Sequence, residues 1–252
     1  MKLESLLQYI DKYMAVEGYP DDPRAVNGLQ VEGRDEVHHV VAAVDASEAS
    51  IQDAVGRGAH LLIVHHGLFW GGTAPLTGRL LRRVKPLIEG RVALYSCHLP
   101  LDSHAEVGNA ALLGRALGLS LEGRFGRFDG VDVGWQGRLD QPVDARALSL
   151  LAEAAVGGPV RLIEGGGPRI ERVGVVTGAG AAAAEEASRL GLDALVTGEC
   201  DHHHYFDAME LGVHLVLAGH YATETFGVKA LAAHVAERFG LTWEFVDRPT
   251  GL

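Results

Sequence analysis

Short runs of consecutive apolar residues alternate with longer amphipathic stretches along most of the chain. The runs with the length of a buried strand are residues 40–44, 61–64, 92–95, 173–176, 194–196 and 215–217. Stretches of helical character follow them, and these are residues 46–56, 108–117, 181–190 and 228–239. Strands that are apolar on both faces and are followed by helices are typical of βαβ units around a mostly parallel, buried sheet. The pattern therefore predicts an α/β protein.

The runs also pair along the chain, which indicates an internal duplication. Residues 41–47 resemble residues 173–179, and residues 58–65 resemble residues 191–198. The first copy carries an additional aromatic and glycine-rich insert at residues 68–78. We therefore predict two related α/β lobes with mostly parallel sheets. The alternative, that any two βαβ units look alike, stays open.

The expected lobe boundaries follow from a segment in the middle of the chain that matches neither copy. Residues 125–162 fit neither copy, and they contain a strand-like piece at 131–138 and a helical stretch at 145–155. We predict a first lobe at residues 1–124 and a second at 125–219. Residues 220–252 are expected to return to the first lobe.

Composition narrows the class of protein. A chain of 252 residues with 47% hydrophobic and 22% charged residues is long enough for two lobes and has the composition of a soluble globular protein. No apolar run reaches the ~18–20 residues that cross a bilayer, and the N-terminus does not resemble a signal peptide. Two distant cysteines, Cys97 and Cys200, fit a reducing compartment, so we expect a cytoplasmic protein without membrane partners. A net charge of −11 without a basic cluster disfavours nucleic acid as the main partner.

A His-x3-carboxylate pattern occurs twice, as His98 to Asp102 and as His220 to Glu224. Each follows an apolar run, and the adjacent His65 and His66 close a third run. Ligands of open parallel sheets collect at the carboxyl ends of the strands, where these side chains are expected. Imidazole with carboxylate suits Zn, Fe, Mn or Co rather than Ca or Mg. The set is large enough for two metal ions, with Asp102 and Glu224 as the natural bridging carboxylates.

Local geometry separates the roles of these residues. His65 and His66 can reach one site only if their strand ends there, because neighbouring strand residues point to opposite faces. His220 and Glu224 share one face if their segment is helical. Pro100 biases the residue before it towards an extended conformation, so His98 is the least secure ligand. It is alternatively a residue that orients a ligand or carries a proton, and any one of these histidines alone could be a packed core residue.

Several neighbouring residues have two interpretations each. Glu199 follows an apolar run and is expected to face the metals and move protons together with a histidine at 203 or 204. The alternative for residues 199–204 is the solvated start of a helix, where acidic residues are favoured. Phe69 and Trp70 either pack in the core or stack on a planar ring beside a flap containing Gly71 and Gly72. A cradle for an anion at Gly178-Ala-Gly180 is a weak prediction, and Ser47 is expected to be a helix N-cap.

Together, these motifs resemble the GTP cyclohydrolase 1 type 2 homologue family, the Nif-three-like dinuclear-metal proteins. The matching pieces are Asn27-Gly-Leu-Gln-Val31, Val44-Asp-Ala-Ser47, His65-His-Gly67, His98-x3-Asp102, Thr197-Gly-Glu199 with His202-His-His204, and Gly219-His-x-Ala-Thr-Glu224. The resemblance covers nearly the whole chain. It implies two metal ions between two α/β lobes and a ring-shaped homohexamer. It also implies five ligands, which are His65, His66, Asp102, His220 and Glu224, with His98 adjacent.

Two classes of function follow from these observations. The first is a metal-dependent hydrolase, in which a metal-activated water attacks a purine ring, as in a GTP cyclohydrolase, with Glu199 and His98 as candidate catalytic residues. A phosphoesterase is the alternative within this class. The second class is a non-enzymatic assembly that carries metal or has a regulatory role. The sequence leaves open the substrate and which two divalent transition metal ions (Fe, Zn, Mn or Co) are bound.

Overall fold

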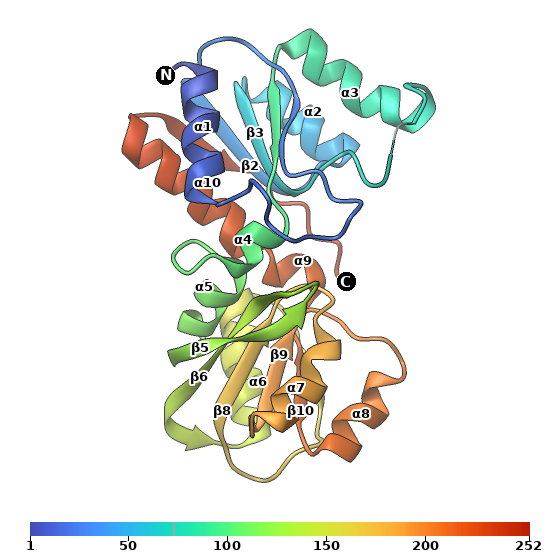
Figure 1. Cartoon of the computed structure of the whole chain (residues 1–252), viewed down its shortest axis with the longest axis vertical. Helices are drawn as coiled ribbons and strands as arrows, with labels where there is room; N and C mark the ends of the chain where they lie inside the picture. The colour runs from blue at the N-terminus through green and yellow to red at the C-terminus, as the bar shows by residue number, and fades with distance from the viewer. Residues whose placement is uncertain (73) are drawn as a thin grey trace. The chain divides into compact units, whose positions relative to one another are not determined.

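A computed structural model describes residues 1–72 and 74–252, and its chain forms two compact units. Unit 1 is Met1–Leu101 with Gly227–Arg248, and unit 2 is Asp102–Phe226 with Pro249–Leu252. Each unit contains one β-sheet with helices packed on it (Figure 1). The predicted α/β fold with two sheets is confirmed. The chain changes unit at residues 101/102, 226/227 and 248/249, whereas the sequence predicted changes at 124/125 and 219/220.

Unit 1 holds a five-stranded sheet in the order β1-β4-β3-β2-β11. The strands are β1 (Gly28–Val31), β2 (His39–Asp45), β3 (Leu61–His66), β4 (Ala93–Ser96) and β11 (Thr242–Phe245). All neighbouring pairs are parallel except β1 with β4. The helices are α1 (Leu3–Tyr13), α2 (Glu48–Gly56), α3 (Gly78–Gly90) and most of α10 (Thr225–Phe239). In Figure 1, α1 and α10 lie on one side of this sheet, and α2 and α3 lie on the other.

This two-sided packing explains the continuous apolar runs. Alternate strand residues point to opposite faces of the sheet. Val41, Leu62 and Leu94 belong to the core cluster that includes Ile51 of α2 and Leu87 of α3. Their strand neighbours are buried as well, because helices cover both faces.

Unit 2 holds a six-stranded sheet in the order β5-β6-β8-β9-β10-β7. The strands are β5 (Leu119–Phe128), β6 (Val131–Val143), β7 (Arg161–Ile163), β8 (Ile170–Val176), β9 (Ala194–Thr197) and β10 (His214–Leu217). The helices are α4 (Leu99–Ser103), which begins in unit 1, α5 (Asn109–Ala116), α6 (Ala145–Val156), η1 (Ala181–Ala183), α7 (Ala184–Arg189), α8 (His204–Leu211) and α9 (His220–Thr223). Only β8, β9 and β10 pair in parallel, so the prediction of mostly parallel sheets holds for unit 1 and not for unit 2.

The β5–β6 hairpin is the reason for the mixed second sheet. Its turn contains Asp129 and Gly130, both with positive φ (42° and 93°). An Asp-Gly pair in this conformation favours a tight antiparallel connection. The two strands extend the parallel core on the side of β8.

The two sheets share a topology that is consistent with internal duplication. The order β1-β4-β3-β2 in unit 1 matches β7-β10-β9-β8 in unit 2, and in both the first strand of the order is antiparallel to the second. A helix precedes the edge strand in each case, α1 before β1 and α6 before β7. The expectation that residues 125–162 fit neither copy is therefore corrected for α6 and β7, which take the places of α1 and β1.

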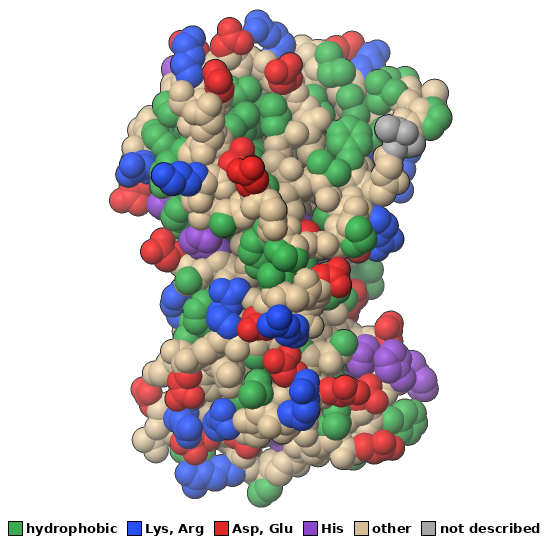
Figure 2. Space-filling model, in the orientation of Figure 1, with side chains coloured by type: hydrophobic (Ala, Val, Ile, Leu, Met, Phe, Trp, Pro, Cys, Tyr) green, Lys and Arg blue, Asp and Glu red, His purple; other side chains and the backbone are tan. Residues whose placement is uncertain are grey.

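Within the described part of the chain, no helix is long and apolar enough to span a membrane. On the face shown in Figure 2, Lys and Arg side chains are interspersed with Asp and Glu. No basic patch of the kind that nucleic-acid binding requires is visible on that face.

Candidate metal-binding residues

Three imidazoles lie together at the carboxyl end of the unit 1 sheet. His65 and His66 are the last residues of β3, and His98 follows β4. One ligating atom from each lies within 4.8 Å of the others. The ring centroid of His65 is 4.6 Å from that of His66 and 5.0 Å from that of His98. His66 reaches the same place as His65 because the strand ends there. The next residue is Gly67, where an added Cβ would clash with the side-chain amide of Gln30.

Each of these imidazoles donates a hydrogen bond from Nδ1 to an oxygen atom. The acceptors are the Cys97 carbonyl for His65 (2.9 Å), Asp45 for His66 (2.9 Å) and Asp21 for His98 (2.7 Å). An oxygen acceptor at Nδ1 selects the tautomer whose lone pair lies on Nε2, and metal-ligating histidines usually have such a partner. The donor set and its tautomers therefore fit a transition metal bound through Nε2.

Asp21 is a residue that the sequence-based prediction missed. Its carboxylate, 6% exposed, also accepts hydrogen bonds from the Leu99 amide (3.1 Å) and the Asn27 side chain (2.7 Å). Burial raises the pKa of Asp21, but the hydrogen bond and charge of His98, together with hydrogen bonds from Asn27 and the Asp22 amide, outweigh burial, so the pKa lies below its usual value. Asp21 stays ionised near neutral pH and fixes the ring of His98. A separation of 77 positions along the chain leaves no local pattern that would reveal this pair.

Asp45 ends β2 and belongs to the motif Val44-Asp-Ala-Ser47, in which the sequence predicts an N-cap at Ser47 but no role for the carboxylate. The predicted N-cap is present, because the Ser47 hydroxyl accepts a hydrogen bond from the Ser50 amide (3.0 Å). The same rule that identified His65, that ligands collect at strand ends, would have found Asp45.

Unit 2 carries the second donor set, formed by Asp102, His220 and Glu224. His220 and Glu224 lie one helical turn apart, as their spacing predicts, and His220 Nε2 is 3.1 Å from Glu224 Oε1. Carboxylate oxygens of Asp102 and Glu224 lie within 4.8 Å of each other. Both carboxylates are buried, at 6% and 3% exposure. Two buried carboxylates this close are costly unless a cation lies between them or one is protonated.

The neighbours of these carboxylates hold them in place. Asp102 Oδ1 accepts hydrogen bonds from the Asn109 side chain and the Thr177 hydroxyl, both at 2.8 Å. Gly178 follows β8 with a φ of 63°. A Cβ there would clash with Glu224 Oε1 and lie 3.3 Å from His220 Nε2. The glycine therefore provides the room in which these two donors lie.

The glycines after β8 do not support the predicted anion cradle. The Gly178 amide donates to the Thr223 hydroxyl (3.1 Å), and the Gly180 amide donates to the Thr197 hydroxyl (3.0 Å). Both N–H groups are thus already used within unit 2.

Glu199 follows β9 and accepts a hydrogen bond from His220 Nδ1 (2.8 Å). His220 therefore also donates from Nδ1 to an oxygen atom, as the three imidazoles of unit 1 do, each to a different acceptor. The hydrogen bond with Glu224 raises the pKa of His220 to about 9 against the opposing effect of burial, and Glu199 adds to the rise. Binding of a metal at His220 Nε2 must therefore displace a proton below this pH.

The histidines at residues 202–204 lie at the start of α8. Donor atoms of Asp201, His203 and His204 lie within 4.8 Å of one another. However, His204 Nδ1 accepts a hydrogen bond from the Asp201 amide (3.0 Å), so its hydrogen lies on Nε2. This is the opposite tautomer to that of His65, His66 and His98, and it disfavours a metal there. Histidine side chains gather on the surface in Figure 2, and His202 and His203 are exposed, which fits the solvated helix start.

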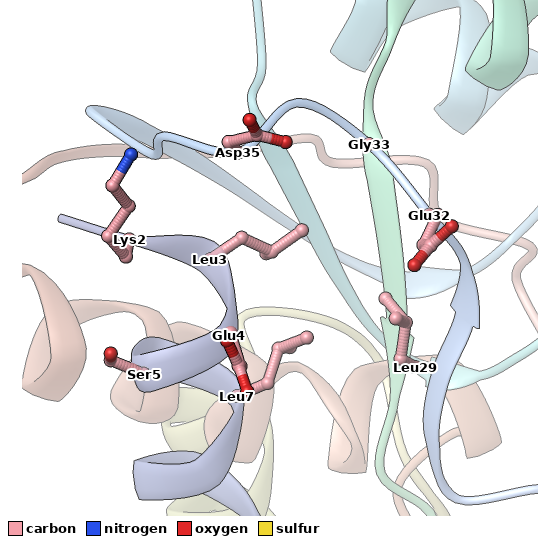
Figure 3. Close-up of a pocket in the computed structure, with 9 residues that line it drawn as sticks. All are labelled: Lys2, Leu3, Glu4, Ser5, Leu7, Leu29, Glu32, Gly33 and Asp35. Atoms are coloured by element: carbon pink, nitrogen blue, oxygen red, sulfur yellow. The ribbon is translucent and has the colours of Figure 1, made fainter.

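A cleft of about 620 Å³ lies elsewhere in unit 1, between the first turn of α1 and the residues around β1 (Figure 3). Leu3, Leu7 and Leu29 give it an apolar lining, and Glu4, Glu32 and Asp35 give it acidic groups. None of the predicted metal ligands lines it.

Fold and donor chemistry together define a mixed α/β protein with imidazole and carboxylate groups that can hold metal. The profile of the Duf34/NIF3 (NGG1p interacting factor 3) family matches residues 1–250, so the chain belongs to that family. The resemblance stated from the motifs is confirmed.

Relatives cover the whole chain. A Deinococcus radiodurans protein named GTP cyclohydrolase 1 type 2 homolog is 42% identical over 250 residues, covering 99% of this chain and 94% of the relative. The solved structure of protein ybgI, described as of unknown function, superposes with a TM-score of 0.93 at 37% identity and covers 100% of both chains. TTHA1606 from Thermus thermophilus has a TM-score of 0.89 at 42% identity, again over 100% of both chains.

Proposed function

We propose that this chain is a metal-dependent hydrolase with a dinuclear centre, acting on a purine ring or a similar substrate. The observation that carries the proposal is the shared arrangement of four imidazoles. His65, His66, His98 and His220 each donate from Nδ1 to an oxygen atom, which leaves Nε2 as the atom for a metal, although at His220 the metal must first displace the proton on Nε2. Core histidines that merely fill space have no need of an oxygen acceptor at the same ring nitrogen.

The positions of the donors along the chain support joint binding by both units. The chain passes from unit 1 to unit 2 between Leu101 and Asp102, and returns between Phe226 and Gly227. His98 and Asp102 flank the first passage, and Glu224 lies two residues before Phe226, the last residue ahead of the second. We propose that both sets hold the same pair of ions, with His65, His66, Asp102, His220 and Glu224 as ligands.

The two metals, when bound, would supply Lewis acidity and lower the pKa of a coordinated water to about 7. The chain's own residues orient the ligands and handle protons. The ionised Asp21 holds His98 so that Nε2 can accept a proton, which suits either a ligand or a general base. Glu199 fixes His220, and its half-exposed carboxylate can exchange protons with water.

The test is an assay of metal-reconstituted protein against GTP and a panel of phosphoesters. His65→Ala and Glu224→Ala each remove one donor, from unit 1 and unit 2 respectively. His202→Ala is the control, because this exposed imidazole belongs to neither donor set. We expect turnover by the wild-type and control proteins and a loss of at least about 100-fold in the other two, as for removal of a metal ligand.

Turnover that persists unchanged in both donor variants would rule out the enzyme. Full metal content without turnover of any compound would instead favour a metal-carrying or regulatory assembly. From the family resemblance we also propose a ring-shaped homohexamer. Light scattering would then give about six times the mass of the chain.

A further inference from the structure

Trp70 lies beside the imidazoles of unit 1 and keeps much of its indole exposed. Its ring centroid is 5.0 Å from that of His98, with the planes nearly perpendicular at 84°, and 6.0 Å from that of His66. The residue is 38% exposed. A large aromatic side chain at the surface next to metal-type donors is more informative than one in the core.

The indole is held in place although it is not buried. Trp70 Nε1 donates a hydrogen bond to the Gly67 carbonyl (3.0 Å). The backbone of Trp70 forms a bridge with Ala25, and the next amide, Gly71, donates to the Arg24 carbonyl (2.9 Å). These contacts anchor residues 67–71 to the segment before β1, where the sequence suggested a mobile flap. A surface fixed in advance loses little entropy when a ligand binds to it.

The chemistry that Trp70 offers to a ligand is its π surface. Its only polar group, the indole N–H, already donates to Gly67. A flat ring can use such a surface without a hydrogen-bond partner, and bases stack on aromatic side chains in this way. A ring placed there would lie next to His66 and His98, where the proposed chemistry occurs.

We propose that Trp70 is the stacking surface for a purine-sized planar ring of the substrate. This proposal rests on the proposed function and names the residue that recognises the ring. Loss of one base–aromatic stack is expected to weaken binding by about tenfold or more.

The test measures binding of guanosine and adenosine to the metal-loaded protein by calorimetry, with ribose as a non-planar comparison. Trp70→Leu removes the ring, and Trp70→Phe keeps an aromatic face. Trp243→Leu is the matched control, because Trp243 is 37% exposed and lies on β11 of the same unit. Metal content and circular dichroism show that each variant is folded and loaded.

We expect nucleoside binding that falls about tenfold in Trp70→Leu, stays within about threefold in Trp70→Phe and is unchanged in Trp243→Leu. Equal affinities in Trp70→Leu and Trp243→Leu would overturn the proposal. Wild-type protein that holds metal but binds neither nucleoside better than ribose would overturn the stacking proposal alone. Wild-type protein that binds no metal would overturn the proposed function and this proposal with it.

Discussion

At the scale of single residues, the candidate site depends on side chains that fix one another across long sequence separations. His65 and Glu224 could be predicted, because each stands in a short motif near a strand end. Asp21 could not, because its partner His98 is 77 residues away. Motifs reveal donors, whereas the carboxylates that orient the donors depend on the fold.

Gly178 gives the sharpest test at this scale. Gly178→Ala places a methyl group against Glu224 Oε1 at a residue whose φ is 63°. Gly212→Ala is the control, since its φ is 70° and an added Cβ meets nothing within 4 Å. Both variants should lose about 1–2 kcal/mol of unfolding free energy from the left-handed backbone.

Only Gly178→Ala should also lose metal, because only there does the methyl group displace a donor. Equilibrium dialysis with Zn²⁺ measures this, and a drop of tenfold or more is expected, as for disturbed ligand orientation. Equal metal affinity in the two alanine variants would show that Gly178 does not make room for the ligands.

The pKa of His220 predicts how stability depends on pH in the metal-free protein. Its folded pKa of about 9 lies above the usual value of 6.5. The stabilisation is therefore fully present below pH 6.5 and is lost as pH rises through about 9. Its size is at most about 3 kcal/mol.

Urea unfolding of chelator-treated protein between pH 6 and 10 measures this dependence. His220→Gln should remove it, so the difference between wild type and variant should shrink as pH rises. A difference that is constant across this range would mean that His220 titrates as it does in the unfolded chain.

At the scale of elements, strands that are buried on both faces could be predicted and edge strands could not. The runs at β2, β3, β4, β8, β9 and β10 are continuously apolar. β5 alternates between buried and exposed residues, and β11 is mostly exposed, so neither gives such a run. Their place in the sheets is set by backbone pairing with a partner, which leaves little trace in the side-chain pattern.

Helix α1 should contribute to stability through one face. Leu6 is fully buried, and Leu7 beside it lines the partly open cleft of unit 1. Leu6→Ala should lower the unfolding free energy by about 2–5 kcal/mol, as for other buried leucines. Leu7→Ala should cost less than half as much, because water already reaches that side chain. Urea unfolding compares the two, and equal losses would contradict the assigned face.

At the scale of the whole molecule, the sequence could predict two α/β halves but not where they change. α4 runs through the passage at residues 101/102 and α10 through the passage at 226/227, so no loop marks either of them. The strand after α5 joins the unit 2 sheet, and the strand after α10, β11, joins the unit 1 sheet beside β2. These two passages therefore each carry a helix, and three of the donors, His98, Asp102 and Glu224, lie in these helices or directly before them.

The proposed dinuclear centre requires donors from both units to hold one pair of metal ions. Anomalous X-ray diffraction at the metal absorption edge, on crystals of the metal-loaded full chain, tests it most directly. We expect two peaks about 3.5–4 Å apart, with His65 and His66 on one side and His220 and Glu224 on the other. Well-folded protein without such peaks, or with metal bound by residues of one unit alone, would contradict it.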